Sequence, residues 1–147
     1  MKENITSNRG KIKQLLEKQH LAVLATQGDN YPYNTLVAYT FSEDLRIIIF
    51  ATMKHTRKYK NLAKHASVSL LIDSRTNKTE DFKEAVALTV LGKTKPSNQP
   101  QYRHMFLHRF PHLKDFLDDP QTTIIVVEID KYIYVQRFQE VLELKMQ

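Results

Sequence analysis

The chain has 147 residues, of which 22 are Lys or Arg and 16 are Asp or Glu, and it contains no cysteine. This length predicts a single domain, residues 1–147, with a substantial core, and the missing cysteine excludes a disulfide scaffold, a thiol nucleophile, a Cys-ligated zinc and an iron–sulfur cluster. No apolar run exceeds five residues and none at the N-terminus suits a signal peptide, so we expect a soluble, cytoplasmic protein with no membrane partner.

The first half of the chain predicts a helix followed by three strands. Apolar residues at helical spacing indicate a short amphipathic helix over residues 11–18. Apolar, aromatic and β-branched residues, separated by short polar turns, then favour strands over residues 20–26, 31–41 and 45–52. The third strand is rich in Ile and Phe, and we expect it to be buried on both faces.

The second half predicts short helices between longer strands. Helical patterns occupy residues 55–65, 102–110 and 113–117. Strand patterns occupy residues 67–73, 85–95, 122–130 and 132–138, whereas residues 74–81 form a polar loop and the tail beyond residue 139 has no assignment. Consecutive strands joined by short turns predict a mainly β (α+β) protein, with an antiparallel sheet closed into a small barrel.

The three glycines exclude several nucleotide-binding and hydrolytic motifs. Gly10, Gly28 and Gly92 lie far apart in the chain. The dinucleotide-binding loop, the P-loop and the nucleophile elbow each need at least two glycines within a few residues. The sequence therefore excludes the enzyme classes that depend on these loops.

The positive charge is concentrated in one segment. Residues 45–72 contain no Asp or Glu but six Lys or Arg residues, which equals the net charge of +6. Several of these basic residues surround the start of the predicted basic helix, where Thr56 is a suitable N-cap. Acidic residues normally favour a helix N-terminus, so cations there suggest a bound anion. From charge alone, a solvated basic face without a ligand is the alternative.

A resemblance to a known family adds to this interpretation. Thr52, Thr56, Arg57 and Lys58 form the pattern Thr-x-x-x-Thr-Arg-Lys between a strand and a helix. Together with the hairpin over residues 21–37, this pattern resembles the pyridoxamine 5′-phosphate oxidase-like FMN-binding split barrels. The resemblance implies a small antiparallel split β-barrel, FMN as the cofactor, and a homodimer in which each flavin lies in a cleft shared by two barrels.

The resemblance also implies which residues contact FMN. Arg57 and Lys58 would clamp its phosphate and Thr56 would donate a hydroxyl hydrogen bond, while Ala51 and Thr52 would contact the flavin or its ribityl chain. Backbone groups facing the edge of the isoalloxazine ring would belong to Asn34, Thr35, Leu36 and Val37. The basic and C-terminal residues with which the oxidase binds its substrate have no clear counterpart, so the resemblance implies flavin binding rather than pyridoxamine phosphate oxidation.

Two classes of function follow. The first is an FMN-dependent oxidoreductase acting with a small-molecule substrate or electron donor, in which the flavin carries the chemistry and no catalytic residue can be named. The second is a non-catalytic module that binds flavin, deazaflavin or haem. A nucleic-acid-binding domain is a further alternative, but the local charge suits one phosphate better than an extended backbone, so we expect no nucleic-acid partner.

Other candidate residues carry weaker signals. His104 and His108 lie one helical turn apart, but Pro111 interrupts the helix before another histidine could join them, so we expect no metal site. Tyr31, Tyr33 and Tyr39 share one face of a predicted strand. Core packing and stacking on a flavin both remain open for these three rings.

Overall fold

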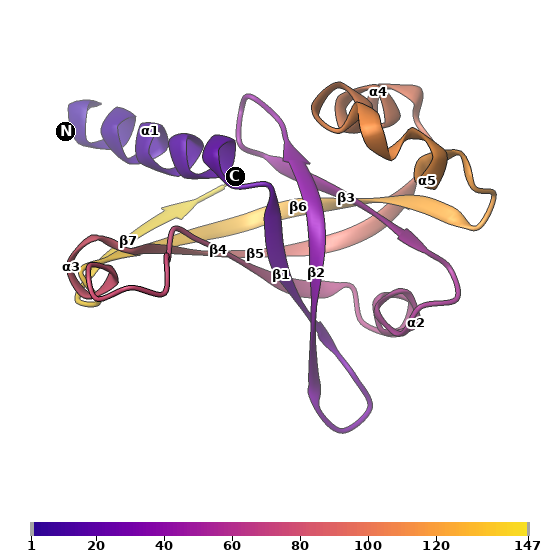
Figure 1. Ribbon diagram of the computed structural model, residues 1–147, viewed down its shortest axis with the longest axis horizontal. Helices are drawn as coiled ribbons and strands as arrows, with labels where there is room; N and C mark the ends of the chain where they lie inside the picture. The colour runs from indigo at the N-terminus through magenta and orange to yellow at the C-terminus, as the bar shows by residue number, and fades with distance from the viewer. Residues whose placement is uncertain (1, 147) are drawn as a thin grey trace.

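A computed structural model describes residues 2–146 of the chain, with side chains from residue 8 onward (Figure 1). The elements are α1 (Lys2–Lys18), β1 (Leu21–Gln27), β2 (Pro32–Phe41), β3 (Ile47–Met53), α2 (Arg57–Lys64), β4 (Ser67–Asp73), α3 (Asp81–Glu84), β5 (Val86–Ser97), α4 (Pro100–Arg109), the 3₁₀ turn η1 (Pro111–Leu113), α5 (Lys114–Asp118), β6 (Thr122–Gln136) and β7 (Glu140–Lys145). Among the described residues, no helix combines the length and the apolar character needed to cross a membrane.

All strand pairings are antiparallel and close the sheet into a barrel. The strand order is β3-β2-β1-β4-β5-β6-β7, and β3 also pairs with β6. That last pairing, from Ile47 opposite Glu128 to Met53 opposite Thr122, closes a ring of six strands, while β7 extends beyond it at β6. The predicted small antiparallel split barrel is therefore confirmed.

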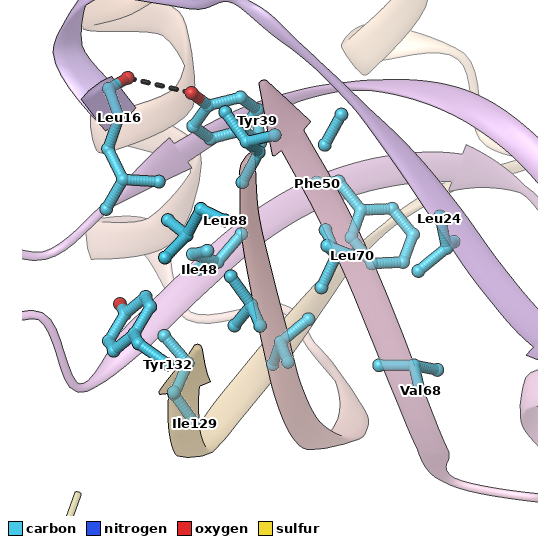
Figure 2. Packing of buried hydrophobic residues seen from close by; sticks show 14 of the residues in the cluster. Leu16, Leu24, Tyr39, Ile48, Phe50, Val68, Leu70, Leu88, Ile129 and Tyr132 are labelled. Carbon is cyan, nitrogen blue, oxygen red and sulfur yellow. Dashed lines mark hydrogen bonds between the residues drawn. The ribbon is translucent and has the colours of Figure 1, made fainter. Parts of the chain in front are cut away.

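The barrel interior is filled by alternate residues of the strands. Phe50, Leu70 and Leu88 are among the fully buried side chains that meet there (Figure 2). Tyr39 also lies in this cluster, and its hydroxyl donates hydrogen bonds to the Leu16 and Gln19 carbonyls at 2.8 and 2.9 Å. The Tyr39 hydroxyl thus fixes the C-terminal end of α1 against the barrel, while the ring packs in the core.

A second apolar cluster lies outside the barrel and covers β3. Ile49 and Ala51 of β3 pack there with Phe106 of α4, with Phe110 directly after that helix, and with Leu117 of α5. Neighbouring residues of β3, such as Phe50, point into the interior instead. The prediction that this strand is buried on both faces is confirmed, because α4 and α5 cover its outer side.

The structure corrects several predicted boundaries. The two strands predicted at residues 122–130 and 132–138 are one strand, β6, with a bulge at Asp130, because Leu91 pairs with Lys131 and Gly92 with Ile129. The tail left unassigned forms β7, and a short helix, α3, begins at Asp81, the last residue of the predicted polar loop. The first helix is also longer than predicted, since it already begins at Lys2.

Candidate functional site

The predicted anion site lies where β3 ends and α2 begins. Thr56 is the N-cap of α2, as predicted, and its hydroxyl accepts a hydrogen bond from the Tyr59 backbone N–H at 3.4 Å. The same hydroxyl donates to the Met53 carbonyl at 2.8 Å and lies 3.0 Å from the Thr52 hydroxyl. Because these bonds already engage Thr56, a phosphate would have to compete for its proton. The first turn of α2 contains no acidic residue.

A pocket of about 330 Å³ opens beside this helix start. Its lining comprises Leu36, Val37, Ala38, Ala51, Thr52, Met53, Thr56, Lys58, Phe106, Leu113 and Phe116. Six of the nine residues predicted from the sequence belong to that set, namely Leu36, Val37, Ala51, Thr52, Thr56 and Lys58. The other three, Asn34, Thr35 and Arg57, are outside the lining. The structure therefore brings most of the predicted residues together.

Helix α4, the turn η1 and helix α5 together supply an apolar wall that the sequence did not reveal. Phe106, Leu113 and Phe116 line the pocket although they lie about fifty residues beyond the predicted motif. The second cluster holds them in place, since Phe106 is fully buried and the other two are half-buried against it. Their signal in the sequence was only an apolar pattern at helical spacing, which is equally typical of core residues.

Lys58 supplies the positive charge of the pocket, whose other lining residues are apolar side chains and threonines. The lysine is half-buried, and burial lowers its pKa because it penalises the charged form. No ion pair links it to a carboxylate within residues 8–146. A partly buried cation without a partner is unfavourable unless an anion binds next to it.

Arg57 takes a different position from its neighbour. Its side chain is exposed, and its guanidinium carbon lies 5.8 Å from the ring centroid of Tyr33. Tyr33 is 39% exposed and Tyr31 80%, whereas Tyr39 is fully buried. The three tyrosines predicted to share one face thus have separate environments.

A buried polar link joins α2 to the β1–β2 hairpin. The side-chain amide of Asn61 in α2 donates to the Thr26 hydroxyl at 3.0 Å, and that hydroxyl donates to the Tyr33 carbonyl at 3.4 Å. Asn61 is 8% exposed and Thr26 2%. Because the link is buried, it fixes the middle of α2 relative to the strand that carries the predicted ring contacts.

The histidine pair lies at a separate pocket of about 460 Å³. His104 and His108 line it with Met105 of α4 and with Phe41 and Glu43 near the β2–β3 turn. Helix α4 ends at Arg109, before Pro111, as predicted. No group of three potential metal ligands occurs in the part of the chain that the structure describes.

Comparisons with known proteins agree with this fold. The family model for pyridoxamine 5′-phosphate oxidase matches residues 9–136. No curated protein matches the chain in sequence. General Stress Protein 26 from Bacillus anthracis has a similar structure, with a TM-score of 0.72 and 19% identity over 92% of this chain and 98% of that one.

Two further similar structures belong to longer proteins. A heme binding protein from Mycobacterium smegmatis gives a TM-score of 0.78 and 14% identity over 89% of this chain and 55% of that one. ChuZ from Campylobacter jejuni gives a TM-score of 0.81 and 9% identity over 95% of this chain and 60% of that one. The chain thus spans little more than half the length of these two proteins. At such identities the structural likeness shows the fold, whereas the family-model match extends over most of the sequence, and the chain belongs to the pyridoxamine 5′-phosphate oxidase-like split-barrel family.

Proposed function

We propose that the chain binds FMN in the pocket between β2, β3, α2 and the α4–α5 wall, and that it is a flavin-dependent oxidoreductase. The observation that carries the proposal is Lys58, a half-buried cation without a carboxylate partner among the described side chains, in a pocket otherwise lined by apolar residues and threonines. FMN combines a phosphate with a flat aromatic ring system, so its two ends match the two parts of this lining.

Each part of the pocket has a role in this proposal. Lys58 and the free N–H groups of the first turn of α2 hold the phosphate, and Arg57 reaches it from the pocket mouth. Thr52 and Ala51 contact the ribityl chain or the ring. The apolar wall of α4 and α5 excludes water from the ring, which strengthens the polar contacts at the phosphate. FMN supplies hydride-transfer chemistry when bound, and the chain binds and orients it for a small-molecule substrate or electron donor.

Titration with FMN and riboflavin tests the phosphate assignment. Charge-assisted hydrogen bonds contribute roughly 1.5–3 kcal/mol each, so Arg57→Ala and Lys58→Ala should each weaken FMN binding about ten- to a hundredfold. Riboflavin lacks the phosphate and should bind the unchanged protein more weakly, with little further loss in the variants. Lys60→Ala is the matched control, because Lys60 is an exposed cation of the same helix outside the pocket lining. Equal losses for riboflavin and FMN would refute the assignment.

The proposal includes a homodimer that completes the pocket. Leu36 lines the pocket yet is 63% exposed. It pairs with Val23 on the outer face of the β1–β2 hairpin, where Leu21 is 54% exposed. A second copy packed on this face would cover these side chains and close the pocket beside Leu36, consistent with the apolar character of permanent interfaces.

Haem binding is the second candidate function. The observation that favours it is the pocket at α4, where His104, His108 and Met105 offer side chains that can ligate iron. The absorption spectrum of the purified protein separates flavin from haem. A His104→Ala/His108→Ala double variant should leave the bound cofactor unchanged if FMN binds as proposed. Loss of a haem spectrum in that variant would place the functional site at α4 instead.

A further inference from the structure

We propose that Tyr33 is a positioning residue for Arg57, whose guanidinium it holds beside the first turn of α2; this inference rests on the proposed function. The guanidinium carbon lies 5.8 Å from the ring centroid, within the roughly 6 Å at which a cation is attracted to an aromatic face. No carboxylate within residues 8–146 forms an ion pair with Arg57. The aromatic ring is the contact that the structure provides for its charge.

Arg57 needs such a contact because its place on the helix does not fix the orientation of its side chain. It is the first residue of α2, so its backbone is fixed by the Thr56 cap, but its long exposed side chain has many rotamers. Fixing those rotamers on phosphate binding reduces affinity. A ring that already restricts the guanidinium removes part of this entropy loss. Contact with the ring uses the charge of the guanidinium and leaves its N–H groups available to a phosphate.

Tyr33 is itself held in register with α2. Its backbone carbonyl accepts from Thr26, whose hydroxyl in turn accepts from Asn61 of α2. Tyr33 also pairs directly with Thr26 in the β1–β2 ladder. The same buried link that ties the hairpin to α2 therefore sets the position of the ring relative to Arg57, and Tyr33 is well placed to act as a fixed support.

Substitutions at Tyr33 should affect FMN and not riboflavin. An exposed cation–π contact corresponds to about a two- to fivefold change in affinity. Tyr33→Leu should weaken FMN binding by that factor and leave riboflavin binding unchanged. Tyr33→Phe retains the aromatic face and should bind FMN as tightly as the unchanged protein. Tyr31→Leu is the matched control, because Tyr31 lies in the same hairpin and is 80% exposed, whereas the cation–π contact of Arg57 is with the ring of Tyr33.

A double-mutant cycle with Arg57→Ala decides whether Tyr33 acts through the arginine. In the Arg57→Ala background, Tyr33→Leu should cause no further loss of FMN affinity, with both measured by flavin fluorescence. An equal loss in both backgrounds, or no loss in either, overturns the inference while FMN binding itself stands. If the unchanged protein does not prefer FMN to riboflavin, the proposed function fails as well. The two failures are therefore distinguishable.

Discussion

Arg109 connects two helices that are distant in the sequence. From the end of α4 its guanidinium donates hydrogen bonds to the carbonyls of Leu16 and Glu17 at 2.9 and 3.2 Å, at the C-terminal end of α1. The guanidinium carbon of Arg109 also lies 5.0 Å from the ring centroid of Tyr39. The last carbonyls of a helix have no partner within it and carry a partial negative charge, so a cation there is favourable.

Replacing Arg109 should destabilise the fold without touching the proposed cofactor pocket. Arg109→Met keeps much of the aliphatic length but removes the hydrogen bonds, and we expect a loss of about 2–3 kcal/mol in the free energy of unfolding, measured by urea denaturation. Lys64→Ala is the control, because its exposed ion pair with Asp29 contributes little. Equal urea midpoints for the two variants would show that α1 does not depend on this contact.

Tyr39 makes the stability of the protein sensitive to alkaline pH. Burial raises its pKa to about 12, and burial also raises the pKa of Tyr132. A tyrosine whose pKa is higher in the folded state stabilises the fold fully below its unfolded pKa of about 10. That contribution is lost as the pH rises through the folded pKa. The free energy of unfolding should therefore fall between about pH 10 and 12.

Comparison with Tyr39→Phe tests this assignment. The variant loses the hydrogen bonds to α1 and should be less stable at neutral pH. Its stability should then decline less steeply above pH 10, as measured by urea denaturation at a series of pH values. Parallel curves for the two proteins would show that other groups cause the alkaline decline.

At the scale of the elements, the bulge between β5 and β6 depends on Gly92. A Cβ atom at this position would lie 2.5 Å from the Glu128 carbonyl oxygen and 2.8 Å from a methyl group of Val127. Gly92→Ala should therefore cost about 1–3 kcal/mol of stability. Gly10→Ala is the opposite case, because nothing lies within 4 Å of the added atom in α1 and alanine favours a helix by up to about 1 kcal/mol. Thermal unfolding should shift in opposite directions for the two variants.

The elements that the sequence failed to predict lack local signals. The sequence predicted a break between the strands 122–130 and 132–138, but a bulge at Asp130 keeps β6 continuous. The real turn that follows contains Arg137 and Phe138, both with positive φ, instead of the glycine or asparagine that such turns favour. The strands with regular alternation of apolar residues were predicted well, since that pattern reflects burial directly.

The motif segment of the candidate site was predictable from its residue chemistry, and the family resemblance added Leu36 and Val37 of β2. Thr52, Thr56 and Lys58 lie within one short segment, and the chemistry of that segment pointed to an anion. The apolar wall from α4 and α5 is brought to the pocket by tertiary packing on the outside of β3, which no local pattern encodes. Arg57 was expected beside Lys58, but successive residues of a helix point in different directions, and the structure places it over Tyr33.

At the scale of the whole molecule, the barrel gathers the proposed site at one edge. Helix α2 and the α4–α5 segment lie on either side of β3 (Figure 1), and the pocket forms where their side chains meet those of β2. On the outer face of β1 and β2, next to this pocket, Leu21 and Leu36 are exposed apolar side chains. This face is where the proposed second copy would pack.

Sedimentation tests that assembly. We expect the protein to sediment at micromolar concentration with twice the 17.3 kDa mass of one chain. Leu21→Asp should shift it toward the monomer, because it would place a charge in the centre of an apolar interface, and it should also weaken binding of FMN and riboflavin alike. Phe82→Asp is the control, since Phe82 is 70% exposed on α3, outside β1 and β2. A 17.3 kDa species at every concentration would refute the dimer. Dissociation by Phe82→Asp alone would indicate an interface at α3 in place of β1 and β2.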